Sequence, residues 1–395
     1  MIKTALEDYK DMIHRCFRCG YCKFTSDYSG FNCPPYTKFR LETYSPGGRM
    51  WLIYASLVKK EIEWTDSLSN ILYTCTMCKN CVEKCRFKFS EDLVNIIRAA
   101  REEIVERALA PPKVRDFLEN VDRQGNPYGE PREKRSDWSK DTEIKRYERG
   151  DEFLYHVGCV GSYDTRSQDA ARALGDILLK SGLSFGILGN KEECDGNEVN
   201  MLGEAGLFDL LIEKNIQKFK DLGVKKIVTL SPHAYNAFKN DYPKDFEVMH
   251  YTQLLRDMIK DGRLDLSKRK ENGFDATITY HDPCFLGRYN GEYDAPREIL
   301  NSIPGVELIE MERNRENAFC CGGGGGNFYT DFMGSEEDSP ARIRVREAYD
   351  TGAEILVVAC PVCLTMLNDA VKMERLEEKL KVKDLSEIVR EICNL

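Results

Sequence analysis

The sequence predicts an α/β protein with an all-α N-terminal domain. Eight of the sixteen cysteines lie within the first 85 residues, among stretches with helical periodicity. The rest of the chain is an internal repeat in which short apolar segments, typical of buried strands, alternate with helical segments. A chain of 395 residues has room for two or three domains. We expect domains at residues 1–110, 151–262 and 263–395, with a linker at 111–150.

The composition argues against several classes of protein. There are 66 acidic and 57 basic side chains, whereas nucleic-acid-binding proteins normally show a basic excess. Met1 to Asp8 lack the apolar stretch of a signal peptide, and the longest apolar run, residues 355–367, is too short to cross a bilayer. We therefore expect no nucleic-acid partner, no membrane span and a cytoplasmic location, where clustered cysteines hold metal more often than they form disulfides.

Two runs of cysteines near the N-terminus share one design. Three cysteines spaced by two residues are followed by a fourth, in Cys16, Cys19, Cys22 and Cys33 and again in Cys75, Cys78, Cys81 and Cys85. This is the ferredoxin spacing for two [4Fe–4S] clusters, in which the fourth cysteine of each run ligates the other cluster. We therefore expect one cluster on Cys16, Cys19, Cys22 and Cys85, and the other on Cys75, Cys78, Cys81 and Cys33.

Structural zinc is the alternative interpretation of these runs. Zinc also uses Cys-x2-Cys pairs, but a third cysteine at the same spacing serves a site made of two pairs poorly. The runs depart from the bacterial pattern in two places: ten residues instead of three precede Cys33, and Arg86 replaces the usual proline after Cys85. Neither departure removes a ligand.

The segments around the second run are predicted to be helical. Residues 49–62 have a helical pattern, and Ser90 is expected to cap a helix that starts a few residues before an apolar stripe, with Glu91 and Asp92 at the positive end of its dipole. The stripe consists of Leu93, Ile96, Ile97, Ala100 and Ile104. The arrangement resembles the α-helical ferredoxin of fumarate reductase and heterodisulfide reductase subunits.

A connector is expected from residue 108 to about residue 150. Pro111, Pro112, Pro127 and Pro131 are predicted to break any regular element, and charged residues crowd positions 132–149. We predict a surface linker, and a segment that docks a partner is the alternative.

The second half contains two copies of one unit. Cys159 matches Cys284, Cys194 matches Cys320, and Val248 matches Val382, so that the offset drifts only from 125 to 134 residues. We predict buried strands at 153–157, 227–230, 278–280 and 355–359, and helices that end before Gly223 and Gly352, at 203–222 and 341–350. Each copy should therefore hold a mainly parallel sheet.

Copy two has a complete cysteine signature, with Cys284 followed by Cys320-Cys321-Gly322 and by Cys360-Pro361-x-Cys363. The signature resembles the CCG domain of heterodisulfide reductases, and the whole chain is similar to the D-subunit family of these proteins. In catalytic members, five such cysteines hold a noncubane [4Fe–4S] cluster and two clusters cleave a disulfide. The resemblance implies one such cluster here, on Cys284, Cys320, Cys321, Cys360 and Cys363.

The glycine run at 322–326 follows the double cysteine. It would let the backbone approach the cluster closely, and its amides could donate hydrogen bonds to sulfur. A phosphate-binding loop is the competing interpretation, but the required Lys-Ser/Thr is absent and Gly-x-Gly-x-x-Gly fails at Asn327. A reactive Cys320–Cys321 disulfide stays open, although vicinal pairs are strained.

Copy one departs from the family pattern. Only Cys159 and Cys194 remain, while the other three ligand positions hold Asp195, Ser231 and Ala234. We therefore expect this copy to be free of metal, which puts heterodisulfide reduction by paired clusters in doubt. Cys393 is expected to be a packing residue. His156 and His281 occupy equivalent positions and should share a structural role, and no catalytic role is assigned to His14, His233 or His250.

The sequence thus predicts an electron-transfer subunit with three clusters. Its partners would be flavoprotein or further iron–sulfur subunits, because no flavin or nicotinamide site is recognisable. Related subunits serve glycerol-3-phosphate, glycolate and lactate oxidation and electron-bifurcating complexes. The alternatives are a catalytic disulfide reductase acting at the C-terminal cluster and a zinc-bound scaffold.

Overall fold

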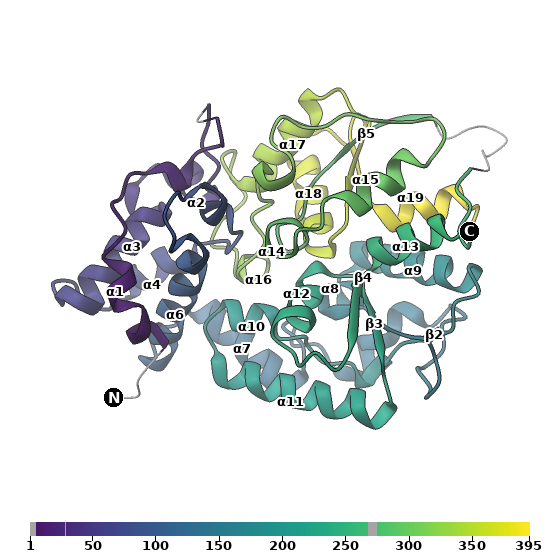
Figure 1. Ribbon diagram of the computed structural model, residues 1–395, viewed down its shortest axis with the longest axis horizontal. Coiled ribbons are helices and arrows are strands. Elements are labelled where there is room, and N and C mark those ends of the chain that lie inside the picture. The colour runs from purple at the N-terminus through teal and green to yellow at the C-terminus, as the bar shows by residue number, and fades with distance from the viewer. Residues whose placement is uncertain (1–4, 28, 268–274) are drawn as a thin grey trace.

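A helical N-terminal region and two α/β units make up the protein (Figure 1). The computed structural model describes residues 5–27, 29–267 and 275–395. Residues 1–4, part of the segment in which no signal peptide is expected, and residues 268–274, near the start of the predicted third domain, lie outside the described residues. None of the described helices combines the length and the apolar character needed to cross a membrane.

Short helices build the N-terminal region around one longer helix, α6. In chain order they are α1 (Lys10–Ile13), α2 (Pro34–Phe39), α3 (Pro46–Tyr54), α4 (Asp66–Tyr73), α5 (Asn80–Lys84) and α6 (Leu93–Glu106). The hydroxyls of Ser45 and Thr65 accept hydrogen bonds from the first turns of α3 and α4 and so fix where these helices begin.

Two details of the predicted helices differ from the structure. The segment expected to be helical at 49–62 is α3 followed by a short π-helix, Ala55–Lys59, which ends at Lys60 in the left-handed conformation. Ser90 does not cap α6, because Ser90–Asp92 forms a 3-10 turn and the helix begins one turn later without a side-chain cap. The predicted apolar stripe of α6 is buried throughout.

The connector contains regular structure, contrary to prediction. Helix α7 (Pro112–Gln124) begins at the proline pair, because a proline at the first helical position has a suitable φ and lacks only an amide that would be unpaired there. Gly125 ends it at φ 70°. A 3-10 helix follows at Arg132–Ser139, and its Arg135 and Trp138 are each only 2% exposed. The segment is therefore packed against the body of the protein.

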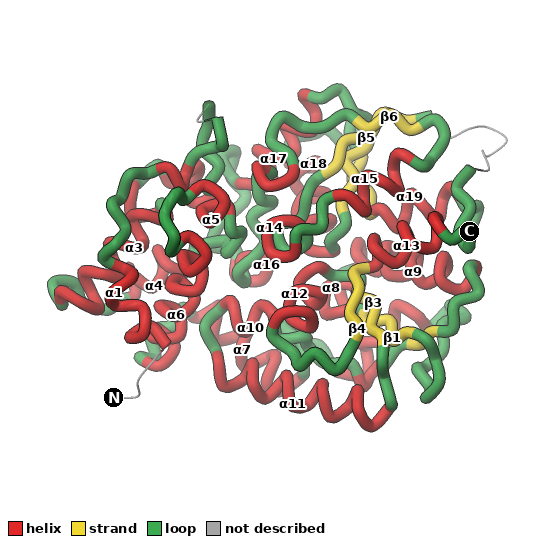
Figure 2. The backbone as a smooth tube through the Cα atoms, in the orientation of Figure 1, coloured by secondary structure: helices red, strands yellow, loops and turns green. Residues whose placement is uncertain are grey.

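Each α/β unit holds a four-stranded parallel sheet, and the two sheets have the same strand order. Strands of both units are drawn in yellow in Figure 2. The first is β2–β1–β3–β4 and the second β6–β5–β7–β8. The strands are β1 (Phe153–His156), β2 (Phe185–Gly186), β3 (Lys226–Thr229), β4 (Glu247–His250), β5 (Ala276–Tyr280), β6 (Val306–Leu308), β7 (Ile355–Val358) and β8 (Lys381–Asp384). The internal repeat and its four predicted strands are confirmed.

Helices connect the strands in both units. The first unit has α8 (Gly158–Tyr163), α9 (Thr165–Lys180), α10 (Asn197–Met201), α11 (Ala205–Leu222), α12 (Pro232–Asn240) and α13 (Tyr251–Lys260). The second has α14 (Gly287–Asn290), α15 (Asp294–Asn301), α16 (Asn327–Thr330), α17 (Pro340–Asp350), α18 (Pro361–Met373) and α19 (Leu385–Ile392). Gly223 and Gly352 lie at the ends of α11 and α17 with positive φ, as predicted.

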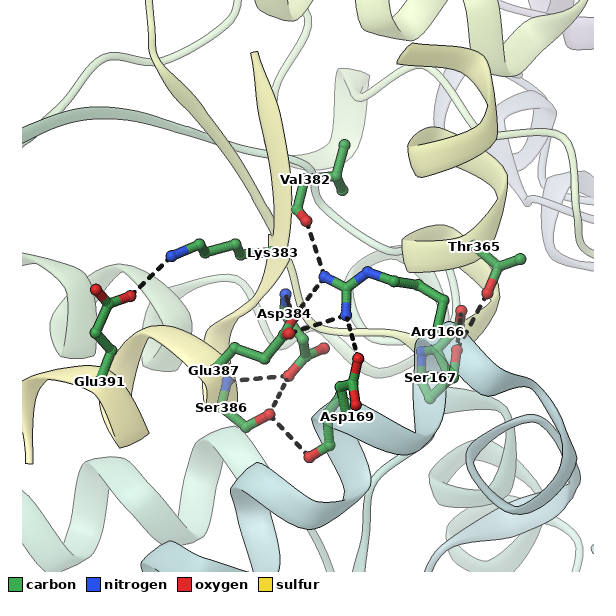
Figure 3. A network of polar contacts seen from close by, with 12 residues as sticks. Arg166, Ser167, Asp169, Thr365, Val382, Lys383, Asp384, Ser386, Glu387 and Glu391 are labelled. Carbon is green, nitrogen blue, oxygen red and sulfur yellow. Dashed lines mark hydrogen bonds and ion pairs between the residues drawn. The ribbon is translucent and has the colours of Figure 1, made fainter. Parts of the chain in front are cut away.

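The two units pack against each other through α9 and α19 (Figure 3). Arg166 on α9 donates to the carboxylate of Glu387 at 2.8 Å and to the carbonyl of Val382 at 2.9 Å, and Ser386 donates to the carbonyl of Ala170 at 3.1 Å. Apolar residues of both units share one core behind these contacts. The units are therefore not independent of each other.

The N-terminal region likewise shares its core with both units. Its buried apolar residues form one cluster with Leu202 and Phe208 of the first unit and Phe285 of the second. The fully buried Arg101 of α6 contacts all three parts of the protein. Its guanidinium donates hydrogen bonds to the carbonyls of Leu72, Tyr73, Cys75, Met201 and Gly325.

Candidate metal centres

The first group of cysteines surrounds one cavity. Its lining contains Cys16, Cys19, Cys22 and Cys85, the set that the ferredoxin spacing predicts for one cluster. Burial raises the pKa of Cys85, and the nearby thiols of Cys16 and Cys19 raise it further. The fourth cysteine of the second run therefore faces the first run. Four thiols around one cavity suit a [4Fe–4S] cluster in donor type and number.

The second group brings Cys33 to the second run. Burial raises the pKa of Cys33 to about 12, and Cys78 and Cys75 contribute to the rise, while Arg49 opposes it. Burial also raises the pKa of Cys81, with contributions from Cys75, Cys22, Cys78 and Cys33. Because Cys22 belongs to the first group, the two groups adjoin.

The two ligand loops have the same backbone shape. In the first loop Arg18 and Gly20 have positive φ, and in the second the equivalent residues Met77 and Lys79 do. Three of these four residues have side chains that disfavour this conformation, so tertiary structure imposes it. The amide of Arg18 donates to the thiol of Cys16, as expected of a loop wrapped around sulfur.

The five cysteines of the second α/β unit form a continuous chain of sulfur contacts. Cys284 contacts Cys320, which contacts Cys321, which contacts Cys363 with 3.4 Å between the sulfurs; Cys363 in turn contacts Cys360. They come from the loops that follow β5, β6 and β7. The carboxyl ends of β5 and β7 meet at the point where the strand order reverses, a usual place for ligands in parallel sheets. Five buried thiols in contact suit an iron–sulfur cluster better than a single zinc ion.

The glycine run serves both the sulfurs and the N-terminal region. The amides of Gly322 and Gly323 donate to Cys320 and Cys321, the first at 3.3 Å. A Cβ on Gly324 would lie 2.6 Å from the carbonyl of Thr76, so only glycine permits this approach. The run therefore lies against the second ligand loop rather than forming a phosphate site.

The second N-terminal group touches the C-terminal group. The thiol of Cys78 hydrogen-bonds Cys320, which raises the pKa of Cys78, and burial raises it further. Arg288 lies between them: its Nε donates to the Cys78 carbonyl at 2.6 Å, and its Nη1 donates to the Ala318 carbonyl at 2.7 Å. Its Nη2 is buried without a hydrogen-bond partner among the described residues. Neither the contact nor the role of Arg288 was predicted, because the sequence gives no sign of which loops meet.

The equivalent place in the first α/β unit is a cavity. Cys159, Cys194, Asp195 and Ser231 line it, whereas Ala234 is buried in the core. The guanidinium of Arg135 donates to Cys159 at 3.5 and 3.6 Å. Four of the five positions aligned with copy-two ligands thus still face a common space.

His233, to which the sequence assigned no role, extends from this cavity to the second unit. Its Nδ1 lies 2.6 Å from Glu198, whose other oxygen accepts from the amide of Gly326. The ring also hydrogen-bonds Cys360. Although burial raises the pKa of Cys360, hydrogen bonds from Cys363 and His233 lower it to about 5. His233 occupies the position aligned with Val362, which is not a ligand position. The one sequence signal for a role of His233 is that it lies between two altered ligand positions, Ser231 and Ala234.

The remaining histidines and Cys393 differ in their surroundings. His156 packs on Phe238. His281 instead accepts a hydrogen bond from Arg344 at 3.1 Å. A ring nitrogen of His281 and the sulfurs of Cys321 and Cys363 all lie within 4.8 Å of one another. The equivalent histidines therefore do not have equivalent neighbours. Cys393 packs against the core shared by the two units.

Comparisons with known proteins agree with this geometry. A model described as a cysteine-rich domain matches residues 153–239 and 278–368, and a 4Fe–4S dicluster domain matches residues 12–89. The clusters expected from the cysteine spacing are thus supported as iron–sulfur clusters. A crystal structure of a hypothetical protein from Helicobacter pylori superposes with a TM-score of 0.54 over 97% of this chain and 75% of its own, at 10% identity, and supports the fold alone.

Several curated proteins are similar in sequence. The D-subunit of the Dihydromethanophenazine:CoB–CoM heterodisulfide reductase of Methanosarcina barkeri is 32% identical over 82% of this chain and 78% of its own length. The probable iron-sulfur-binding oxidoreductase FadF of Bacillus subtilis is 41% identical over 80% of this chain, and the EtfAB:quinone oxidoreductase of Syntrophomonas wolfei is 35% identical over 81%. The chain spans about half the length of these last two, 46% of each.

Proposed function

This chain belongs to the D-subunit family of heterodisulfide reductase iron–sulfur proteins, and we propose on that basis that it is an electron-transfer component of a larger oxidoreductase. Two N-terminal [4Fe–4S] clusters and one noncubane-type [4Fe–4S] cluster in the second repeat would form the relay. Such clusters, when bound, gain and lose single electrons. The domain division at 1–110, 111–150, 151–262 and 263–395 remains part of this proposal.

The contact between Cys78 and Cys320 is the observation that favours a relay. One of these residues is a ligand proposed for the second N-terminal cluster, and the other is proposed for the C-terminal cluster. The buried Arg288 adds a positive charge at the contact, and the thiols of Cys78, Cys284 and Cys320 raise its pKa after burial has lowered it. A cation between two thiolate groups stabilises electron-rich states on either side.

Partner subunits would exchange electrons at the opposite end of the relay. Cys19 is the exposed member of the first group, and Phe17 beside it is 74% exposed. The name of the Syntrophomonas relative includes both EtfAB and a quinone, and by analogy we propose a flavoprotein or a further iron–sulfur protein as the partner here.

Metal analysis and spectroscopy of the anaerobically purified chain test the proposal. We expect about 12 irons with matching sulfide, as three clusters of four. About 8 irons would remove the C-terminal cluster, about 16 would place one in the first repeat as well, and a colourless zinc protein would support a scaffold. In a freeze-quench EPR series with a protein-sized donor, Cys19→Ala should slow reduction of the C-terminal cluster, and Cys393→Ala should not.

A second candidate function is catalysis at the C-terminal group, which would reduce a disulfide as the name of the Methanosarcina relative implies for that protein. The cavity between the two repeats favours it, because His233 and Val362 both line it and His233 hydrogen-bonds Cys360. Turnover of small disulfides by the isolated chain with a reduced dye would contradict a pure relay. No turnover with any disulfide would count against catalysis.

A further inference from the structure

Two cysteines that the proposed function does not use lie side by side in the first repeat. Cys159 and Cys194 both line the cavity described above and are nearly completely buried. The thiol of Cys194 hydrogen-bonds Cys159, and the amide of Gly196 donates to Cys194 at 3.5 Å. The equivalent amide of Gly322 donates to Cys320 in the second repeat. The first repeat has therefore kept the geometry of its two remaining sulfurs.

A buried arginine favours the thiolate form of one of them. Arg135 donates to Cys159 through both terminal nitrogens and forms an ion pair with Glu192 at 2.9 Å. The hydrogen bond from Cys194 lowers the pKa of Cys159, and the charge of Arg135 lowers it further, although burial opposes both. A thiolate held beside a thiol and a cation is the arrangement of a reactive dithiol.

The same neighbours argue against a metal ion at this place. The guanidinium already supplies the positive charge next to Cys159, and Glu192 is engaged by Arg135 and by the amides of Val157 and Gly158. Asp195 accepts from the amide of Asn197 at 2.9 Å. In the part of the chain that the structure describes, three metal-binding side chains converge at His281, Cys321 and Cys363 instead.

We propose that Cys159 and Cys194 form a redox-active dithiol that undergoes exchange with a low-molecular-mass disulfide, RS–SR, at the mouth of this cavity. The Cys159 thiolate attacks one sulfur of the reagent, the RS–SR bond breaks, and RS⁻ leaves. Cys194 then gives its proton to the second leaving group and attacks the sulfur of Cys159, which breaks the mixed disulfide. The two cysteines lose two electrons and one proton in total, and the reagent gains them as RS⁻ and RSH.

The dithiol would add a second redox group to the proposed relay, with different chemistry. The relay uses one-electron groups on thirteen other cysteines, whereas the pair stores two electrons in a sulfur–sulfur bond. The cavity connects the pair to His233 and Val362 of the adjoining site. A failure of the relay would leave this proposal standing, since its test reads out the oxidation state of two named sulfurs.

The test uses the complete, cluster-loaded chain under anaerobic conditions. The chain is equilibrated with graded ratios of 2-hydroxyethyl disulfide to 2-mercaptoethanol, quenched with acid, alkylated, digested and analysed by mass spectrometry. We expect one two-electron transition that links the peptides of Cys159 and Cys194, reversed by excess thiol, at unchanged iron content. Cysteines that remain alkylatable at every ratio would overturn the proposal.

Variants assign the two sulfurs. In Cys194→Ser the mixed disulfide should accumulate on Cys159, whereas Cys159→Ser should trap at least tenfold less on Cys194. Equal trapping on both would overturn the assigned order of attack. Cys393→Ser is the matched control, because this residue also lies outside the proposed ligand sets and should leave the transition unchanged.

A paired variant tests the role of Arg135 as a positioning residue. Arg135→Gln combined with Glu192→Gln removes both charges and so leaves neither one stranded in the interior. We expect Cys159 to be alkylated about tenfold more slowly near neutral pH, since a pKa higher by about one unit lowers the thiolate fraction tenfold. A change in stability without a shift in the pH profile of alkylation would contradict this role.

Discussion

The two α/β repeats share a backbone design and differ in what their loops hold. Both sheets have the same strand order, and the cysteine two residues before the glycine turn accepts the same amide hydrogen bond in each. In the second repeat five sulfurs are in contact, whereas in the first Arg135 contacts one of two. The fold therefore does not depend on a full ligand set, since an arginine–glutamate pair occupies part of the space in the first repeat.

Cysteine substitutions should affect iron binding differently in the two repeats. Cys321→Ser should remove about four irons, because this residue lies at the centre of the sulfur chain of the second repeat. Cys194→Ser, in the first repeat, should retain all of them. Iron and sulfide analysis measures both variants, and an equal loss in the two would mean that the first repeat also binds a cluster.

The residue that connects both repeats to the N-terminal region gives the second prediction. Arg101→Ala should destabilise the protein by about 4 kcal/mol, because buried carbonyls left without a donor cost about 1–3 kcal/mol each. Arg107→Ala is the control, since its side chain is 41% exposed and hydrogen-bonds Glu103 one turn earlier. Thermal unfolding should show a clear drop for the first variant, and similar midpoints for both would contradict the prediction.

Equivalent positions in the two repeats should respond to pH in opposite directions. His250 and Asp384 each precede the helix after the last strand, and both are buried. Burial lowers the pKa of His250 to about 3 and raises the pKa of Asp384 to about 7. Both side chains are therefore favoured in their neutral forms.

The direction of each effect of pH on stability follows from the pKa values in the unfolded chain, 6.5 for His250 and 3.8 for Asp384. Stability linked to His250 is present above pH 6.5 and lost as the pH falls towards 3, because only the unfolded chain takes up the proton. Stability linked to Asp384 is present below pH 3.8 and lost as the pH rises through 7. Unfolding measured against pH should lose the first slope in His250→Gln and the second in Asp384→Asn. Unchanged slopes would contradict the assignment.

The smallest effect concerns the histidine that crosses from the first repeat to the second. His233→Gln should lower the reduction potential of the proposed C-terminal cluster by about 60 mV, a tenfold change for a one-electron couple, because it removes a charged donor from Cys360. Redox titration followed by EPR measures it. The N-terminal clusters of the same sample are the internal control, and equal shifts in all clusters would argue against a local effect.

The features that the sequence predicts correctly are those that depend on periodicity or on the spacing of nearby residues. The apolar strands, the repeat and the stripe of α6 follow from periodicity, and the pairing of Cys85 with the first run follows from ferredoxin spacing. The sequence does not predict helix α7, because Pro112 has the pattern of a helix breaker, although in the structure it starts the helix. The contacts of Arg135 and His233 join segments that are distant in sequence, and no spacing rule reports such contacts.

The shared core of the N-terminal region also sets the order in which the protein can mature. That core contains Val121 and earlier residues, yet it is complete only when Phe285 and Cys320 have joined it. At a synthesis rate of about 5–20 residues per second, the roughly 200 residues after Val121 take about 10–40 s to emerge from the ribosome. During that interval Cys78 lacks the contacts with Cys320 and Arg288 that it has in the finished chain. We therefore expect iron and sulfide to reach the second N-terminal group most easily in that interval, before the second repeat folds against Cys78.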